Sequence, residues 1–429
     1  MSPTLRTGAD AAPAGGGPAA PYGAAMVPLP SDIALVHEWF TPRSVGGAEL
    51  VVRRIDALLS RIGAPPSLYA LVDGESRRPG SWLEGRPIGT SFIQSLPFGV
   101  SHVQQYLPLL PLAIEQLDLR GHPLVFSSSH LVAKGVLTGP EQLHVSYVHT
   151  PVRYAWDQMA PYLASSRIAR SPLGPLVRWQ LHQLRQWDVL SSLRVDALIA
   201  NSRFTASRIR RCWRRRAHVV HPPVEVGRFR CDQPRGDVYL SLCRLVPNKR
   251  VDVVVEAFNR TGLPLVVIGD GPERSRLQAM AAPHIRFLGR CPEPEVNGWM
   301  ERCRAYVYAG LEDFGIAPVE AMAAGAPVIA YGAGGLCDSV RCVASGASHP
   351  TGLLFPAQDA SSLTAALSHF EEKRLWRQLP PEGQRSWAET FAPARFEQRL
   401  LTLLEALWDG HRRRLEHRLQ PLTTPVPLT

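Results

Sequence analysis

The chain has 429 residues, more than one hydrophobic core usually serves, so we expect two domains of about 180 to 200 residues each. Its composition, 45% hydrophobic and 20% charged, is typical of a soluble globular protein and offers neither a good membrane span nor a secretory signal. We therefore expect a cytoplasmic protein. The net charge of +10 either arises by chance or favours an anionic partner: membrane surface, nucleotide phosphates or nucleic acid.

The seven cysteines are odd in number, and no two of them are separated by just two residues. This argues against a disulfide framework or a zinc site and fits a reducing compartment. No Asp-x-Asp occurs, so a metal-bridged diphosphate site has no obvious ligands. We expect no metal and no cofactor.

Residues 1–30 are mostly Ala, Gly and Pro and bury too little apolar surface to fold, so we expect a disordered tail. The apolar run 33–37 predicts a buried parallel strand, followed by a helix from about Ala48. Between them, Gly46 and Gly47 allow the backbone to approach a phosphate or sugar closely, although an ordinary tight turn explains them as well.

Further strands alternate with helical or irregular segments, which predicts a parallel sheet whose ligands bind at the carboxyl ends of the strands. These strands are 67–72, 123–130, 143–151 and 196–202. His149 lies at such an end, where a histidine is either structural or catalytic.

Ser202 is a suitable N-cap for a helix over 203–216, a segment with seven arginines. Its apolar members, Ile209, Cys212 and Trp213, fall on one helical face. Three interpretations remain open: a surface that lies on anionic membrane, a plain solvated face, and a nucleic-acid surface. The scarcity of stacking aromatics makes nucleic acid the least favoured.

A second set of alternating elements predicts a second parallel sheet facing the first across a cleft. Arg244 follows its first strand and Lys249 lies in the loop before the helix 251–261. Two cations at a strand mouth suit a diphosphate, but are also explained as surface charges. Gly271, in the turn GDGPE, is explained by turn chemistry alone.

The stretch 311–336 carries the strongest functional pattern. Pro318 suits the first turn of a helix that ends before Gly325, so Glu312 lies on the preceding loop and Glu320 on the first turn. Between them, the backbone N–H groups of Phe314, Gly315 and Ile316 are available to an anion. Two acceptor-only carboxylates beside a phosphate site suit a ligand with hydroxyls and phosphate, such as a nucleotide sugar.

Glu312 and Glu320, with Phe314-Gly315-Ile316 after the first and Gly325-Ala326-Pro327-Val328-Ile329 after the second, resemble the motif of the retaining glycosyltransferases of family 4. The resemblance covers about residues 33 to 410. It implies the α/β fold called GT-B, two Rossmann-like domains facing a cleft. The implied parts are the acceptor domain 31–222, the nucleotide-sugar donor domain 223–392, and a helix 393–418 that crosses back to the first domain.

The same resemblance implies roles for individual residues. His149 and Glu312 would be catalytic, and Arg153 and Asp157 weaker contacts. Glu320 would bind the ribose, and the remaining donor-binding positions would be Gly46, Gly47, Arg244, Lys249, Gly271, Phe314, Gly315 and Ile316.

The segment HTPVRYAWD and the early GGAE loop resemble bacterial mannosyltransferases that take GDP-mannose and build exopolysaccharide or O-antigen repeats on a polyprenyl diphosphate carrier. We therefore expect a nucleotide sugar, a lipid-linked acceptor and a peripheral position on the inner face of the cytoplasmic membrane. Three alternatives stay open: a UDP-sugar such as UDP-glucose as donor, a sugar-nucleotide epimerase, and a nucleic-acid-binding protein that uses the arginine-rich helix.

Overall fold

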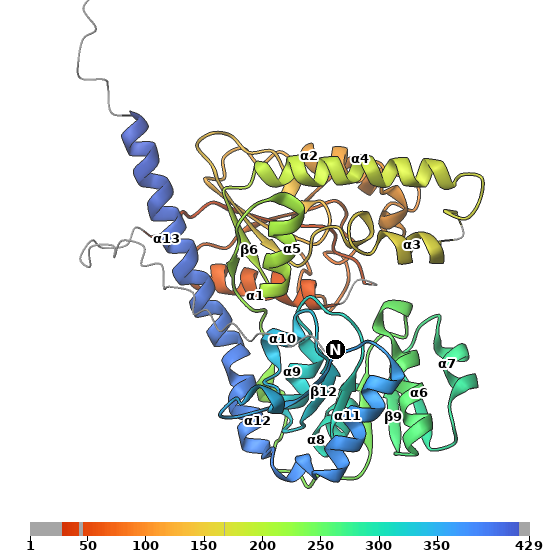
Figure 1. The fold of residues 1–429 in the computed structure, drawn as a ribbon. Coiled ribbons are helices and arrows are strands. Elements are labelled where there is room, and N and C mark those ends of the chain that lie inside the picture. Colours follow the sequence, from red (N-terminus) through yellow and green to blue (C-terminus); the bar gives the residue numbers. More distant parts are fainter. Residues whose placement is uncertain (1–27, 43–45, 167, 420–429) are drawn as a thin grey trace, which may run out of the picture.

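The computed structural model of the chain describes residues 28–42, 46–166 and 168–419. They form two α/β domains, each built on its own sheet, one above the other in Figure 1. Neighbouring strands are parallel throughout both sheets. The predicted alternation of strands and helices around two parallel sheets is confirmed.

The N-terminal domain has a seven-stranded sheet in the order β3-β2-β1-β4-β5-β6-β7. Its strands are β1 Ile33–His37, β2 Ser67–Ala70, β3 Ile88–Thr90, β4 Leu124–Ser129, β5 Leu143–Val148, β6 Ala197–Ala200 and β7 His218–Val219. Its helices are α1 Gly47–Arg61, α2 Leu110–Glu115, α3 Met159–Ser165, α4 Gly174–Leu193 and α5 Arg203–Trp213. Every residue of the central strands β1, β4 and β5 is buried, as expected of strands covered on both faces.

The C-terminal domain has a six-stranded sheet in the order β10-β9-β8-β11-β12-β13. Its strands are β8 Tyr239–Leu242, β9 Leu265–Ile268, β10 Ile285–Gly289, β11 Tyr306–Tyr308, β12 Val328–Tyr331 and β13 Gly352–Phe355. Its helices are α6 Val251–Thr261, α7 Arg274–Met280, α8 Glu293–Arg302, α9 Ile316–Ala323, α10 Leu336–Ser339, α11 Ala360–Glu372 and α12 Pro381–Ala388.

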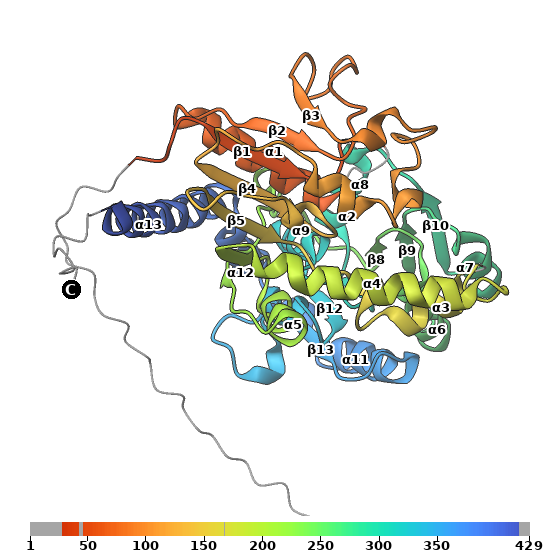
Figure 2. The same cartoon turned by 90° about the horizontal axis from the view of Figure 1, so that it is seen from above.

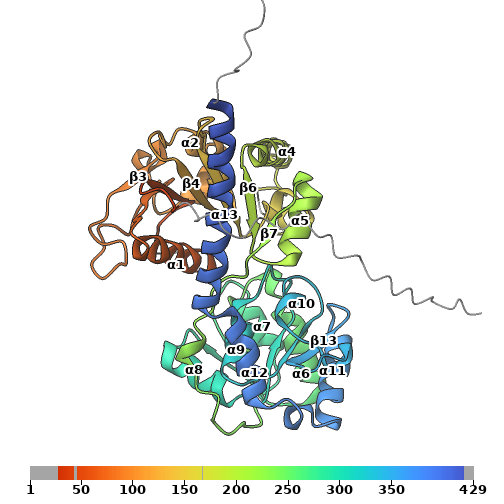
Figure 3. The ribbon, with the colours of Figure 1, turned by 90° about the vertical axis from the view of Figure 1, so that its left-hand side faces the viewer.

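The last helix, α13 Pro393–Leu419, starts against the C-terminal domain and runs along the N-terminal domain, as Figure 3 shows. Phe396, Leu400, Leu404 and Trp408 recur at helical spacing and are buried in the core around β1 and α1. The predicted return of this helix to the first domain is confirmed.

The domain limits 31–222, 223–392 and 393–418 stay predictions, although each sheet lies within its expected range. The tail predicted over residues 1–30 falls outside the described residues as far as residue 27, as does the end of the chain after residue 419.

Candidate active site

The order of the strands determines where a ligand can bind. In each sheet the direction of strand addition reverses once, between β1 and β4 in the first and between β8 and β11 in the second. Ligands of open parallel sheets bind outside the carboxyl ends of the strands at such a reversal. His149 follows β5 near the first reversal, while Arg244 and Glu312 follow the two strands at the second. The topology thus brings most of the predicted site residues to the interface between the domains.

Glu312 is held by two neighbours in the C-terminal domain. Lys249 forms an ion pair with its carboxylate, and the hydroxyl of Tyr308 donates a hydrogen bond to the same oxygen. Burial opposes ionisation, but Lys249, Tyr308 and the more distant Arg153 outweigh it and hold the pKa of Glu312 below its usual range. Glu312 is therefore an ionised hydrogen-bond acceptor. Its cationic partner, Lys249, is one of the two residues that the sequence assigned to a diphosphate.

The start of α9 has the predicted geometry. Gly315 has φ +91°, and a Cβ atom there would lie 2.6 Å from a methyl group of Leu336, so only glycine fits. Within the part of the chain that the structure describes, the N–H groups of Gly315 and Ile316 have no hydrogen-bond acceptor. They point out of the helix start, where the dipole favours an anion.

The glycine turn of the N-terminal domain lies against this helix start. A Cβ atom on Gly47 would lie 2.8 Å from the Cδ1 atom of Ile316. The turn formed by Gly46 and Gly47 and the start of α9 therefore belong to one site, although Gly47 and Ile316 are 269 positions apart in the sequence. A side chain at Gly47 would have to displace the end of the Ile316 side chain from the other domain.

Glu320 differs in detail from its prediction. Because α9 begins at Ile316, Glu320 lies in its second turn and not its first. Its carboxylate is 2.9 Å from the guanidinium of Arg228, which also lies 3.2 Å from Glu293. Burial raises the pKa of Glu320, and Arg228 only partly opposes it. A ligand hydroxyl would therefore meet a carboxylate that already has a cationic partner.

Both carboxylates nevertheless act on one buried side chain, Tyr306. The hydroxyl of Tyr306, at the start of β11, donates to the carbonyl oxygen of Leu242, 2.7 Å away. Burial raises its pKa well above the usual value, and the charges of Glu312 and Glu320 both raise it further. The two glutamates thus lie within electrostatic reach of one buried side chain.

The loops after β8 and β9 lie together as well. A Cβ atom on Gly271 would lie 2.3 Å from the carbonyl oxygen of Leu245, so this contact requires glycine. Arg244, next to Leu245, is exposed and makes no ion pair or side-chain hydrogen bond with any described residue. Arg244 is thus a charged side chain at the strand mouth, whereas Lys249 is already paired.

His149 is buried at the end of β5. Its Nε2 atom lies 2.8 Å from the hydroxyl oxygen of Ser128. Burial, with smaller contributions from His130 and His37, lowers the pKa of His149 well below its ordinary value. The imidazole is therefore neutral at neutral pH, a state able to accept a proton or to donate a hydrogen bond.

A cluster centred on Asp313, which sequence reasoning did not identify, joins the domains. Asp313 is buried and pairs with two arginines of the N-terminal domain, Arg208 at 2.8 Å and Arg153. Arg208 also binds the side chains of Asp157 and Thr150. The only feature of the sequence that could have identified Asp313 was its position directly after Glu312. The weak contact roles expected for Arg153 and Asp157 correspond here to ion pairs, which tie the segment after His149 to the loop that carries Glu312.

Glu38 is a second buried carboxylate that the sequence did not single out. It accepts hydrogen bonds from the backbone N–H groups of residues 130–133 at 2.7 to 3.0 Å and from the hydroxyl of Ser129. Burial raises the pKa of Glu38, but His130 and these N–H groups outweigh it, so its pKa lies below the usual range. Glu38 thereby fixes the turn after β4 that packs beside His149.

The predicted membrane role of 203–216 is wrong for its apolar face. Ser202 caps α5 as expected, accepting a hydrogen bond from the N–H group of Thr205. However, Ile209 and Trp213 are buried against β6, with Cys212 partly buried beside them. Because the sheet of the same domain already covers this face, it is not free to lie on a bilayer.

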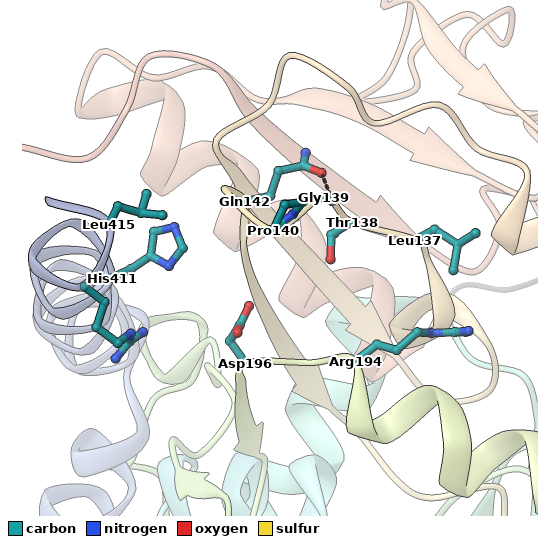
Figure 4. Close-up of a pocket in the computed structure, with 10 residues that line it drawn as sticks. Leu137, Thr138, Gly139, Pro140, Gln142, Arg194, Asp196, His411 and Leu415 are labelled. Carbon is teal, nitrogen blue, oxygen red and sulfur yellow. Dashed lines mark hydrogen bonds between the residues drawn. The ribbon is translucent and has the colours of Figure 1, made fainter. Parts of the chain in front are cut away.

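A cavity of about 480 Å³ lies elsewhere, between α13 and the loops that precede β5 and β6. Figure 4 shows His411 and Leu415 of α13 facing Gln142 and Asp196 across it. These loops lie at the amino ends of the strands, opposite to the edge where ligands of such sheets bind. Among the described residues, no cluster of three or more His, Cys, Asp or Glu could hold a metal ion.

Two parallel-sheet domains joined by a returning helix, with cations and a free helix start at the facing strand ends, define the GT-B class of α/β proteins. A solved structure agrees: sucrose-phosphate synthase of Thermosynechococcus elongatus superimposes with a TM-score of 0.63 and 18% identity, over 88% of this chain and 99% of that one. Residues 233–388 match the family described as "Glycosyl transferases group 1". The matched part of the chain contains Arg244, Lys249, Glu312 and Glu320.

Two curated relatives match parts of the chain. D-inositol 3-phosphate glycosyltransferase of Jonesia denitrificans is 32% identical over 175 residues, 33% of this chain and 40% of that protein. The GDP-mannose-dependent alpha-(1-6)-phosphatidylinositol monomannoside mannosyltransferase of Mycolicibacterium smegmatis is 28% identical over 243 residues, 49% of this chain and 62% of that protein. The chain thus spans 40% and 62% of these two relatives' lengths.

Proposed function

We propose that this protein is a retaining glycosyltransferase that moves a hexose from a nucleoside diphosphate sugar to an acceptor hydroxyl. The observation that carries the proposal is the group formed by Lys249, Glu312 and the open start of α9, at the strand reversal of the domain that matches the family. These groups offer a cation, an ionised acceptor and free N–H groups within one loop cluster. Such a set fits a ligand that combines hydroxyls with a diphosphate.

The donor would bind with its diphosphate at the strand mouth of the C-terminal domain. Arg244 is exposed and able to bind phosphate oxygens, and the N–H groups of Gly315 and Ile316 add neutral donors. Lys249 would exchange its pairing with Glu312 for a shared position between that carboxylate and the phosphate. Glu320 would accept hydrogen bonds from the ribose hydroxyls.

The reaction breaks the bond between the anomeric carbon and the diphosphate oxygen and forms one to the acceptor oxygen, whose proton is lost. Attack from the side of the leaving group retains the configuration at this carbon. Negative charge develops on the departing diphosphate, so the groups that face it would contribute most of the rate acceleration. Loss of one such donor typically lowers the rate by about 100- to 1000-fold. Glu312 would hold sugar hydroxyls, and neutral His149 would lie beside the reacting carbon from the other domain.

We propose GDP-mannose as the donor and a lipid-linked oligosaccharide on a polyprenyl diphosphate as the acceptor, for exopolysaccharide or O-antigen assembly. The name of the relative from Mycolicibacterium smegmatis supports the donor and an acceptor that carries a lipid, because that protein depends on GDP-mannose and acts on a phosphatidylinositol monomannoside. A UDP-sugar such as UDP-glucose is the second candidate donor, since Arg244, Lys249 and Glu312 would contact the phosphates and hydroxyls of the donor and not its base. The protein would work at the cytoplasmic face of the membrane; no described helix is both long and apolar enough to cross a bilayer.

A transfer assay tests this function. Purified protein with radiolabelled GDP-mannose or UDP-glucose and a membrane lipid extract should move label into the organic phase, and His149→Ala should abolish most of the transfer while leaving nucleotide binding intact. His182→Ala, at an exposed histidine of α4, is the matched control. Free epimerised nucleotide sugar without an acceptor would identify an epimerase instead. Full transfer by His149→Ala would remove that residue from the reaction.

A further inference from the structure

The exposed hydrophobic side chains of this protein are distributed unevenly. Among the described residues, all twelve large hydrophobic side chains with high exposure lie between positions 62 and 193, in the N-terminal domain. The C-terminal domain contributes none of them. Six of the twelve lie in or just before α4: Ile168, Leu173, Leu176, Trp179, Leu190 and Leu193.

Helix α4 carries these side chains on an outer face. Figures 1 and 2 show α4 on the outside of the N-terminal domain, on the side away from the C-terminal domain. Six of its exposed positions recur at alternating separations of three and four residues, which places them on one stripe, and exposed Arg178 and His182 lie beside it. We call this stripe the α4 face; it consists of Leu176, Trp179, Gln183, Gln186, Leu190 and Leu193.

The α4 face is apolar but not a core surface. Leu176, Trp179, Leu190 and Leu193 are 58%, 55%, 62% and 59% exposed, although the opposite side of the helix buries Leu181, Leu184 and Asp188. Scattered exposed leucines need no explanation, but four large apolar side chains on one helical stripe mark a contact surface. The α4 face has no charged member, since its other two positions are glutamines.

Positive charge is concentrated around it. Residues 158–216 contain twelve arginines, two aspartates, and neither lysine nor glutamate. The surplus of ten positive charges in this segment equals the net charge of the whole chain, so the other 370 residues together are neutral. One of the two aspartates, Asp188, is buried and pairs with Lys134 at 2.6 Å. Arg194 and Arg208 pair with acidic residues outside the segment, but exposed Arg170 and Arg178, next to the α4 face, make no ion pair with any described residue, so the border of this face is basic.

Helix α5 supplies much of this charge. The indole N–H group of Trp213 in α5 donates to Asp188 in α4 at 2.7 Å, so the two helices are fixed side by side, as Figure 3 shows. With the apolar face of α5 buried against β6, Arg210, Arg211 and Arg214 remain exposed. Because Asp188 lies on the side of α4 opposite the α4 face, these arginines add positive charge to the same domain, and exposed Arg178 of α4 itself borders the apolar stripe.

We propose that the α4 face, bordered by Arg178, docks the N-terminal domain on an anionic lipid bilayer, with the exposed arginines of the adjoining helix α5 adding to the attraction. Leucine and tryptophan on one stripe would enter the headgroup boundary, while arginines at its border would bind the lipid phosphates. The positive charge around the apolar stripe favours an anionic bilayer over other partners. A second copy of the chain would bring two basic surfaces together, and nucleic acid would leave the leucines without an apolar partner. The inference rests on the proposed function in that a lipid-linked acceptor would require the protein to reach the membrane. Vesicle binding itself requires neither donor nor acceptor.

The first test is sedimentation with vesicles of phosphatidylcholine containing phosphatidylglycerol, compared with pure phosphatidylcholine. The wild-type protein should bind the anionic vesicles, and salt should weaken this binding. Trp179→Gln/Leu190→Gln should lower the partition coefficient by about 100-fold, about tenfold for each side chain removed from the bilayer. Ile62→Gln/Phe98→Gln, at exposed hydrophobic positions away from the α4 face, is the matched control and should bind like the wild type.

The second test locates the contact without relying on a double variant. Brominated lipids should quench part of the tryptophan fluorescence of the wild type, and Trp179→Leu should lose that part while keeping vesicle binding. Unchanged binding by Trp179→Gln/Leu190→Gln, or equal quenching in Trp179→Leu, would overturn the proposal. So would a dimer, or binding to duplex RNA, that these α4 substitutions abolish. Because the vesicles carry no sugar donor or acceptor, failure here is distinguishable from failure of the proposed transferase activity.

Discussion

Asp313→Asn should loosen the contact between the two domains. The substitution keeps the shape of the side chain but removes the charge that Arg208 and Arg153 approach from the N-terminal domain. These ion pairs lie directly beside Glu312, so the open and closed arrangements of the cleft should differ mainly in whether they are made. Loss of the charge should shift the population toward the open arrangement.

The magnitude follows from burial. The side chains of Asp313 and Arg208 are each 8% exposed, and removing one partner of such a pair typically costs about 3 to 5 kcal/mol. Arg208 keeps Asp157 and Thr150 as partners, so we expect the lower value. About 3 kcal/mol corresponds to a change of about 100-fold in the ratio of closed to open protein.

Small-angle X-ray scattering without ligand is the assay. Asp313→Asn should have a larger radius of gyration than the wild type, and its urea midpoint should be lower. Asp237→Asn is the control: its side chain is 85% exposed and pairs with Arg304, so the cost should stay below about 1 kcal/mol. If Asp313→Asn shows the scattering profile and urea midpoint of the wild type, the ion pairs do not hold the domains together.

Two further predictions concern other parts of the chain. Gly47→Val should drive a side chain into Ile316, 2.8 Å from the Cβ position, and so weaken donor binding at an unchanged melting temperature. Ile316→Ala in the same protein should recover part of the binding, and no recovery would show that the contact is unimportant. Burial lowers the pKa of His144 from 6.5 to about 3, so below pH 6.5 the unfolded chain gains a proton that the folded protein refuses. Stability should therefore fall as the pH drops through this window, by up to about 1.4 kcal/mol per pH unit for this group. In urea titrations His144→Gln should flatten that loss and His182→Gln, at an exposed histidine, should not; equal slopes in all three proteins would contradict the assignment.

Much of the fold is predictable from sequence because buried parallel strands are short apolar runs between turn residues. The helix expected over 251–261 matches α6 at both ends, because its apolar stripe and Gly262 determine its bounds. The short strands β3 and β7 were missed because three and two residues carry no periodic pattern. Helix α4 shows a different limit. A sequence displays its apolar positions but not which of two stripes the sheet will cover.

Most residues of the candidate site were predictable from the sequence, but the contacts between them were not. Strand ends placed Glu312 and Lys249 near each other, but their direct ion pair joins loops 63 positions apart and depends on the tertiary packing. Arg208 is one of seven similar arginines in the sequence, and only the fold distinguishes it as the buried partner of Asp313. The burial of Ile209 and Trp213 likewise depends on the tertiary packing, and it removes the apolar face of α5 as a bilayer contact.

The most direct measurement is a thermal-shift panel of GDP, UDP, ADP and TDP on the wild type and on Lys249→Met. A ligand that binds only the folded protein stabilises it by about 2.7 kcal/mol at 100 times its dissociation constant. GDP should raise the melting temperature of the wild type most, and Lys249→Met should lose most of that rise. A protein that none of the four nucleotides stabilises, or a rise that survives unchanged in Lys249→Met, would contradict a diphosphate site at Lys249 and Glu312.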